Sequence, residues 1–385
     1  MGYDKNIFGE KILRKNIQIA LPAIGREEIE AVIGVLRDKA LTDESGSGTY
    51  VRKFEEAFAK FVGVKYAVAL SSGTAALHAA LIASDIGAGD EVIVPSFTFT
   101  ATAEAVALTG AKPVFVDINP KTYCIDPEQI KEAITSKTRA IIPVHLYGLM
   151  ADMEAIMEIA EEHDLIVIED ACQAHGAELK GRKAGSYGDL ACFSFYASKI
   201  ITTGEGGMVT TNRRDYAEII QSIRRHGMGR YEASERLGHN YRMTEIAAAI
   251  GYYQLQKISK FLEARRKNAQ QLTALLESVG RLELPEEPPD YKHAWYLYTV
   301  RLRGGRVGER NKLVSKLVAS GIQAKVYYGT PIHMSPYYRR TFGTKPRSLP
   351  KTETAARQVF SLPCHQGLSE DDINYIAQKV KKFVK

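Results

Sequence analysis

The sequence lacks several features that would place it in a special class of protein. None of its four cysteines, Cys124, Cys172, Cys192 and Cys364, forms a C-x-x-C pair, so neither a zinc site nor a thioredoxin motif is expected. No apolar run approaches the roughly 18 residues that cross a bilayer, and the first 25 residues lack the apolar core of a signal peptide. We therefore expect a cytoplasmic protein that binds no metal and no membrane.

A charge excess of one sign is also missing, since the net charge is only +6 in 385 residues. Basic side chains alternate with acidic ones, as in residues 26–39, REEIEAVIGVLRDK, so we expect a solvated surface and no bound nucleic acid. The chain has neither a Walker phosphate loop nor the G-x-G-x-x-G fingerprint of nicotinamide dehydrogenases, which makes a dehydrogenase a poor alternative.

What the chain does have is an alternation of apolar runs and amphipathic stretches over residues 64–211. Helical patterns occupy 73–86, 126–135 and 152–163, the second with Asp126 as N-cap and Pro127 as first helical residue. The apolar runs are typical of strands covered on both faces, and they lie at 66–70, 91–96, 112–118, 139–148, 165–171, 190–196 and 206–211. The alternation predicts an α/β domain with a mainly parallel seven-stranded sheet between helices.

The pattern changes beyond about residue 260. A long polar helix at 259–280, a proline-rich connector at 284–295, a strand at 296–302 and a helix at 310–321 follow one another. We predict a large domain, residues 1–260, and a smaller C-terminal α+β domain, residues 261–385, with residues 1–20 packing on the small domain. In such folds ligands bind beyond the carboxyl ends of the strands.

The turn after the first strand, in VALSSGTAALHAAL (residues 68–81), can bind phosphate. Gly73 permits close approach of the backbone, and Ser72 or Thr74 can donate a hydroxyl. The free N–H groups at the helix start also attract an anion. An ordinary N-cap would use the same residue types, so this motif alone does not decide.

A second polar turn follows the strand in LIVIEDACQAHGA (residues 165–177). Asp170 can cap the next turn or, when ionised, pair with a cation in a dry site. Gln173 and His175 can add further polar contacts.

The third candidate is Lys199 in FSFYASKIITTGEGGMVTT (residues 193–211), between an apolar strand and the glycine-rich turn 204–207. Aromatic and aliphatic neighbours such as Tyr196 and Ile200 argue against a merely solvated side chain. A neutral lysine amine attacks aldehydes. A surface lysine on an irregular turn is the alternative.

Together the three turns match the needs of pyridoxal phosphate. This cofactor requires a lysine for its aldehyde, an anion at its pyridine nitrogen, a phosphate cradle and a flat group on its ring. Lys199, Asp170 and Gly73 with Thr74 supply the first three. Phe99, in PSFTFTATA (residues 95–103), is a candidate for the fourth, although ordinary core packing would also explain it.

The blocks SSGTAALHAAL, IEDACQAHGA, FSFYASKIITTGEGGMV and HNYRMTEIAAAIG occur in an order that resembles the DegT/DnrJ/EryC1/StrS family of nucleotide-sugar aminotransferases. The resemblance covers nearly the whole chain and implies the aspartate-aminotransferase-like fold and pyridoxal phosphate as cofactor. It further implies a homodimer in which Asn240 reaches the neighbouring subunit's cofactor phosphate.

The resemblance also implies a role for each site residue. Lys199 would hold the cofactor as a Schiff base and carry protons, and Asp170 would pair with the ring nitrogen. The other implied contacts are Gln173 with the ring hydroxyl, Gly73, Thr74 and Ser194 with the phosphate, Phe99 with the ring, and His175, Tyr241, Arg242 and His333 with the sugar nucleotide.

The expected reaction transfers an amino group from L-glutamate to a keto-deoxy sugar linked to dTDP, UDP or GDP. Relatives that carry histidine in place of the lysine are dehydratases, so Lys199 favours transamination. His175 resembles a residue of members that act on 3-keto sugars, although it can equally serve only the local structure. A regulatory or sensory protein that binds the cofactor without turnover is the alternative from another class.

Overall fold

The large sheet defines the molecule, which is described here from a computed structural model for residues 16–229 and 233–384. Within these ranges the sheet contains β1 (Tyr66–Leu70), β2 (Glu91–Pro95), β3 (Lys112–Val116), β4 (Thr138–Ile141), β5 (Ile166–Asp170), β8 (Leu190–Ser194) and β9 (Gly207–Thr211). Their order is β1-β9-β8-β5-β4-β2-β3. The strands from β3 to β8 pair in parallel, whereas β9 is antiparallel to both of its neighbours. The predicted, mainly parallel sheet of seven strands is confirmed.

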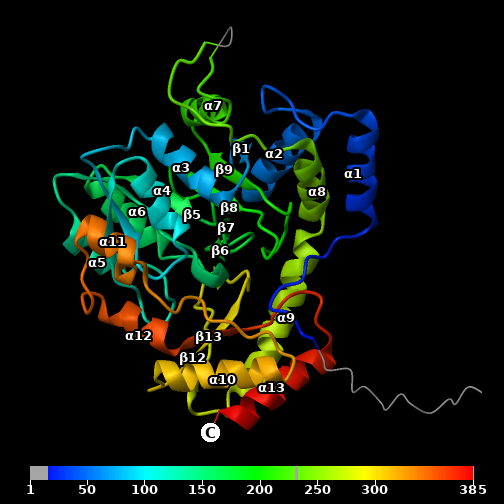
Figure 1. The fold of residues 1–385 in the computed structure, drawn as a ribbon, viewed down its shortest axis with the longest axis vertical. Coiled ribbons are helices and arrows are strands. Elements are labelled where there is room, and N and C mark those ends of the chain that lie inside the picture. The colour runs from blue at the N-terminus through cyan, green and yellow to red at the C-terminus, as the bar shows by residue number, and fades with distance from the viewer. Residues whose placement is uncertain (1–15, 230–232, 385) are drawn as a thin grey trace, which may run out of the picture.

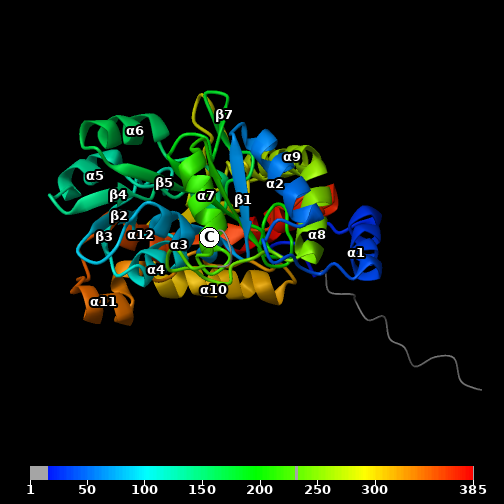
Figure 2. The same cartoon turned by 90° about the horizontal axis from the view of Figure 1, so that it is seen from above.

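Helices cover both faces of this sheet, which explains why its strands are apolar without alternation. In β1, Val68 and Leu70 pack in the apolar layer on one face of the sheet, whereas Ala67 and Ala69 pack in the layer on the other face. Figure 2 shows α3 (Gly73–Ala83) and α4 (Ala101–Leu108) on one side and α5 (Pro127–Ala133) and α6 (Met153–Glu162) on the opposite side. The other helices of this part are α2 (Thr49–Val62), α7 (Arg214–Ile223), α8 (Glu245–Gln256) and α1 (Arg26–Asp38).

The helix starts follow the capping residues of the sequence. Ser72 caps α3, with its Oγ accepting a hydrogen bond from the Ala75 N–H at 3.1 Å. Asp126 caps α5 in the same way through the Glu128 N–H, and Pro127 is the first helical residue, as predicted. The predicted strand at 139–148 is shorter, because the chain turns into the short helix η1 (Leu146–Gly148) soon after β4.

A second core lies below the large sheet in Figure 1. It is built on a three-stranded sheet of β10 (Leu282–Glu283), β12 (Tyr298–Leu302) and β13 (Val359–Leu362). Helix α9 (Ile258–Leu276) connects the two cores, because Phe261 packs in the first and Leu272 in the second. The boundary predicted at residue 260 thus falls near the start of a continuous helix. The helices of this part are α10 (Val307–Ala319), α11 (Pro336–Phe342), α12 (Pro350–Gln358) and α13 (Glu370–Phe383).

The N-terminal segment contacts the second core at Ile17, near the first residue that the structure describes. Ile17 donates its N–H to the Gly321 carbonyl at 2.8 Å and its side chain packs in that core. Residues 1–15 of the segment predicted to pack there lie outside the described residues. In the described part of the chain, no helix is long and apolar enough to span a membrane. A small sheet completes the fold, with β6 (Glu178–Leu179), β7 (Arg182–Lys183) and β11 (Tyr291–Lys292).

Candidate active site

A cavity of about 690 Å³ lies beyond the carboxyl ends of β5 and β8, beside the first turn of α3. This is the edge at which parallel sheets bind ligands. The lining residues are Ser72, Gly73, Thr74, Leu77, Thr98, Phe99, Ala101, Thr102, Asp170, Cys172, Gln173, Ser194, Tyr196, Ser198, Lys199, Glu205, Tyr296, Val326, Tyr327 and Tyr328. The cavity therefore brings together all the predicted cofactor residues except Asn240.

The first turn of α3 forms an anion cradle that has no room for a side chain at Gly73. A Cβ atom there would lie 2.8 Å from the Ser194 Cβ and 3.0 Å from the Cys172 Sγ. The backbone N–H groups of this turn and the hydroxyls of Thr74 and Ser194 remain close to the cavity. Ser72 serves as the N-cap, whereas the next two residues, Gly73 and Thr74, are the ones available to bind a ligand.

Asp170 ends β5 and directs its carboxylate into the cavity, with only 5% of the residue exposed. Thr102 donates its hydroxyl to Oδ2 at 2.7 Å, and the Cys172 N–H donates to Oδ1 at 3.2 Å. These two hydrogen bonds fix the orientation of the carboxylate, which can meet a cationic partner in the cavity.

The preceding residue, Glu169, points away from the cavity because successive side chains of a strand alternate. It is fully buried and accepts hydrogen bonds from His145 Nε2 at 2.8 Å and from the N–H groups of Gly185, Tyr187 and Gly188. Burial opposes ionisation, but these donors outweigh it and lower the pKa of Glu169. Of the two adjacent acids, only Asp170 is available to a ligand.

Lys199 lies in the loop after β8, half-buried, with its Nζ 4.8 Å from the centre of the Tyr296 ring. Ser198 precedes it and shares a hydrogen bond of 3.1 Å with the Tyr296 hydroxyl. The cavity is thus closed on one side by Gly73, Thr74, Asp170, Ser194 and Lys199, which we call the strand-end wall. Tyr296, Tyr327 and Tyr328 form the facing side, which we call the aromatic wall.

Gln173 and Phe99 lie where the two walls meet. Gln173 accepts from the Tyr147 N–H at 3.0 Å and donates to the Tyr328 hydroxyl at 3.1 Å. Phe99 is 55% exposed and tilts towards Tyr328, with ring centres 6.2 Å apart. Exposure of such a large apolar ring inside a cavity supports a ligand-stacking role over core packing.

The four residues predicted at the sugar nucleotide do not line the cavity. His175 is fully buried against Phe193 and Phe195, and burial, reinforced by the charge of Lys199, lowers its pKa to about 3. His333 is buried as well, 2.6 Å from the Ser96 hydroxyl.

The other two residues of that set lie in the loop around Asn240. The Tyr241 hydroxyl contacts His78 Nδ1 at 3.0 Å, and the side chain of Arg242 packs beside Gly46. Asn240 itself is exposed and pairs through its backbone with Arg225. This loop therefore does not complete the cavity of its own chain.

Sequence reasoning missed Thr102 and the whole aromatic wall. Thr102, in the first turn of α4, lies four residues after Thr98, and the two hydroxyls are 3.2 Å apart. The aromatic wall comes from the segments YKHAWYLY and KVYYG, whose dense tyrosines were the only signal.

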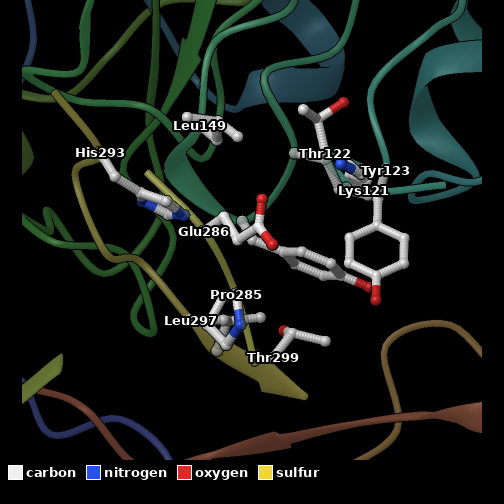
Figure 3. A pocket seen from close by; sticks show the side chains of 11 residues that line it. Lys121, Thr122, Tyr123, Leu149, Pro285, Glu286, His293, Leu297 and Thr299 are labelled. Carbon is white, nitrogen blue, oxygen red and sulfur yellow. The ribbon is translucent and has the colours of Figure 1, made fainter. Parts of the chain in front are cut away.

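A second hollow lies behind the aromatic wall, between Lys121, Glu286, His293 and Thr299 (Figure 3). Its volume for water-sized occupants is only about 10 Å³, which is no more than one water molecule requires. A substrate cannot bind there.

Comparison with known proteins agrees with the geometry. A model of the DegT/DnrJ/EryC1/StrS aminotransferase family matches residues 22–381. GDP-perosamine synthase of Caulobacter vibrioides is 41% identical over 94% of this chain and 96% of its own length. UDP-N-acetyl-3-dehydro-alpha-D-glucosamine 3-aminotransferase of Acidithiobacillus ferrooxidans is 39% identical, over 93% and 94%. A pleiotropic regulatory protein of Geobacillus stearothermophilus is 43% identical, over 87% and 90%.

Solved structures show the same similarity. DesV of S. venezuelae superposes with a TM-score of 0.88 at 37% identity, covering 93% of this chain and 94% of its own. The Streptococcus pneumoniae protein Spr1654 in its PLP-form superposes with a TM-score of 0.91 at 28% identity, covering 96% and 98%.

The cavity residues fit pyridoxal phosphate. Glycine at position 73 lets the start of α3 pack against Ser194 and Cys172, with which a Cβ would collide. The first turn of α3 therefore lies at the cavity, where helix N–H groups suit a phosphate. The carboxylate of Asp170 can meet a protonated ring nitrogen, and Lys199 can reach an aldehyde in the same cavity.

Proposed function

The chain belongs to the DegT/DnrJ/EryC1/StrS aminotransferase family, and from this premise we propose that it transfers an amino group from L-glutamate to a keto-deoxy sugar nucleotide. It is a pyridoxal-phosphate-dependent aminotransferase of the sugar-nucleotide type. The observation that carries the proposal is the convergence of Lys199, Asp170 and the first turn of α3 on one cavity.

Each residue of the strand-end wall has a separate task in this proposal. Gly73, Thr74 and Ser194 bind the phosphate, while Asp170, positioned by the Thr102 hydroxyl, pairs with the ring nitrogen and keeps a proton on it. Phe99 stacks on one ring face, and Gln173 donates to or accepts from the ring hydroxyl. When bound, pyridoxal phosphate accepts the electron pair that a substrate carbon leaves behind when it loses a proton.

Lys199 has two tasks. Its amine would hold the cofactor through the aldehyde between turnovers. When substrate takes that place, the free amine would accept the proton from the substrate carbon and return it to a carbon of the cofactor. Lys199 lies in the loop that follows β8 and lines the cavity. A histidine, the residue of the family's dehydratases, cannot re-form the link, which supports transamination here.

The neighbouring copy supplies what one chain lacks in this proposal. Asn240 is exposed and outside its own cavity, so it can bind a phosphate only in the cavity of a second subunit. We assign the active form to a homodimer with shared sites, in the cytoplasm. The four free thiols suit that reducing compartment.

The sugar nucleotide binds at the open side of the cavity, although Tyr241, Arg242 and His333 do not line that cavity in their own chain. Relatives named for GDP- and UDP-linked sugars support these two nucleotides, with dTDP as the third candidate. His175 is fully buried, so any effect on 3-keto preference must pass through the packing of Phe193 and Phe195 and not through contact with the sugar.

The test is a half-reaction followed by full turnover. With L-glutamate, the holoenzyme should lose the visible absorbance of lysine-bound cofactor and release 2-oxoglutarate in equal amount. Keto-deoxy sugars linked to GDP, UDP and dTDP should then restore the band, and NMR of the product should show whether carbon 3 or carbon 4 carries the amine. Absence of the first change with every common amino donor would contradict amino transfer.

A regulatory protein that binds the cofactor without turnover is the second candidate, favoured by the name of the Geobacillus relative. It predicts the lysine-bound band without loss of that band on adding glutamate. The half-reaction therefore separates the two candidates directly.

A further inference from the structure

Tyr296 faces the reactive atom of the site, although none of the proposed cofactor contacts requires it. The Lys199 Nζ lies 4.8 Å from the centre of its ring, within the roughly 6 Å at which an aromatic face attracts an ammonium group. Within the described residues, no carboxylate lies within ion-pair distance of that nitrogen. The oxygens of Asp170, the buried acid of the cavity, already accept from Thr102 and the Cys172 N–H.

The backbone of Tyr296 is held in place by the buried guanidinium of Arg265. Arg265 of α9 donates through Nη1 to the carbonyl oxygens of Trp295 and Tyr296, both at 3.2 Å. Trp295 has a φ of 52°, in the left-handed region that bulky residues rarely adopt. Its N–H donates to His293 Nδ1 at 2.8 Å, and its ring stacks on that histidine at 4.0 Å. The unusual backbone next to Tyr296 is thus fixed by several contacts.

The same segment packs on η1, the short helix that follows β4, at Gly148. The Ala294 N–H donates to the Gly148 carbonyl at 2.8 Å, and a Cβ on Gly148 would lie 3.0 Å from the Tyr296 nitrogen. The ring therefore keeps a fixed position relative to the strand-end wall, even though Tyr296 is about a hundred residues beyond Lys199 in the chain.

The front of the ring is tied to the lysine loop. The Tyr296 hydroxyl shares a hydrogen bond of 3.1 Å with Ser198, the residue immediately before Lys199. The Tyr296 side chain therefore contacts both the Lys199 nitrogen, through its ring face, and the side-chain hydroxyl of the preceding residue, through its own hydroxyl.

We propose that Tyr296 is a positioning residue whose ring face holds the Lys199 ammonium while that lysine carries the substrate proton. This inference rests on the proposed function, in which Nζ gains the proton that the substrate carbon loses and becomes positively charged. An ion pair would hold the ammonium more firmly and oppose return of the proton. A ring face attracts it more weakly, so the lysine stays near the reaction and remains able to release the proton.

The first experiment uses the cofactor-free protein and needs no turnover. An amine-specific acylating reagent is applied, and modification of Lys199 is followed by peptide mass spectrometry, with the other lysines as internal references. The ring face covers Nζ and attracts its ammonium group. Tyr296→Leu should therefore raise the labelling rate about three- to thirtyfold, or about 0.7–2 kcal/mol at 1.4 kcal/mol per factor of ten. Tyr296→Phe keeps the ring and should stay within about twofold of wild type.

Two outcomes of this labelling would overturn the proposal. One is Tyr296→Leu reacting at the wild-type rate. The other is Tyr296→Phe reacting as fast as Tyr296→Leu, which would assign the effect to the hydroxyl bond with Ser198. Tyr298→Phe, which loses a buried hydroxyl contact with Thr273 outside the cavity, controls for general loosening. Tyr296→Met replaces the leucine variant if that one fails to fold.

The second experiment uses the holoenzyme with glutamate deuterated at the α-carbon. Tyr296→Leu should lower kcat of the half-reaction about three- to thirtyfold with an enlarged isotope effect and little change in KM, whereas Tyr296→Phe should retain both values. A Leu variant with unchanged kcat and isotope effect would contradict the role in proton transfer. If the wild-type holoenzyme does not react with glutamate, the proposed function fails, whereas the labelling comparison still tests the ring.

Discussion

The two walls of the cavity enclose the same site, but they come from different parts of the chain and are held in place by different kinds of contact. The strand-end wall consists of the last residues of β5 and β8, Asp170 and Ser194, and of residues in the segments that follow β1 and β8. Each polar side chain is therefore placed by a strand close to it in the sequence. The aromatic wall consists of Tyr296, Tyr327 and Tyr328, which follow α9 in the chain and pack against the core of the large sheet. Arg265 and contacts with η1 hold the backbone around Tyr296.

The two walls also differ in the groups that they offer to a ligand. Charged groups and hydroxyls that can bind the cofactor lie on the strand-end wall, whereas the aromatic wall offers ring faces and hydroxyls that bond to other protein groups. Changes in the first wall should therefore remove the reaction, and changes in the second should alter its rate by smaller factors.

The largest effect is expected from Lys199→Ala. Loss of both the covalent link and the proton carrier should lower the rate of amino transfer by at least about 10³-fold. The check is kcat of the glutamate half-reaction in protein saturated with cofactor. Lys183→Ala, which removes a lysine packed on Phe61 away from the cavity, is the matched control and should retain wild-type kcat.

Asp170→Asn should have the next largest effect. The amide cannot supply the negative charge that keeps the ring nitrogen protonated, and loss of one partner of a buried charge pair costs about 3–5 kcal/mol. We expect kcat to fall about a hundredfold or more, measured alongside cofactor affinity. Thr102→Val, which removes only the supporting hydroxyl at 2.7 Å, should lose about tenfold. Equal kcat in wild type and Asp170→Asn would mean that the strand-end wall does not hold the ring nitrogen.

Acid should lower the free energy of unfolding, because a buried histidine packs behind each of the two walls. Burial lowers the pKa of His175, behind the strand-end wall, and of His293, behind the aromatic wall, from 6.5 to about 3. Since the folded pKa is below the unfolded one, the unfolded chain gains protons first, and stability present above about pH 6.5 is lost as the pH falls.

The expected loss is about 1.4 kcal/mol per pH unit for each of the two histidines. Urea unfolding between pH 7.5 and 5 measures it. His175→Asn and His293→Asn should each reduce the pH dependence by about that amount. A pH dependence that neither substitution changes would show that neither histidine is buried in its neutral form.

The smallest effect is expected from Tyr328→Phe in the aromatic wall. It removes only the hydrogen bond to Gln173 at 3.1 Å, worth about 0.5–1.5 kcal/mol. The KM for glutamate should change by less than about tenfold, with the cofactor link intact. A loss as large as that of Asp170→Asn would break the distinction between the two walls.

The sequence predicted one wall and not the other for a physical reason. A strand end followed by Ser-Gly-Thr, by Asp or by Lys places chemistry within a few residues, so local spacing is enough to locate Gly73, Asp170 and Lys199. The seven-stranded sheet was predictable in the same way, because burial on both faces produces apolar runs.

The aromatic wall depends on contacts between residues about a hundred or more positions apart. Nothing local to Tyr296 shows that Arg265 and Gly148 will hold it over Lys199, because that arrangement arises only when the second core docks. Likewise, the burial of His175 behind Phe193 and Phe195 is a packing outcome that its place in QAHGA does not reveal.

The most direct test of the account is to locate the cofactor link. Holoenzyme is reduced with borohydride, digested and mapped by mass spectrometry. We expect one added pyridoxyl phosphate per chain, on Lys199, and none on the Lys199→Ala variant. A label on another lysine, or an equal label on the variant, would contradict it.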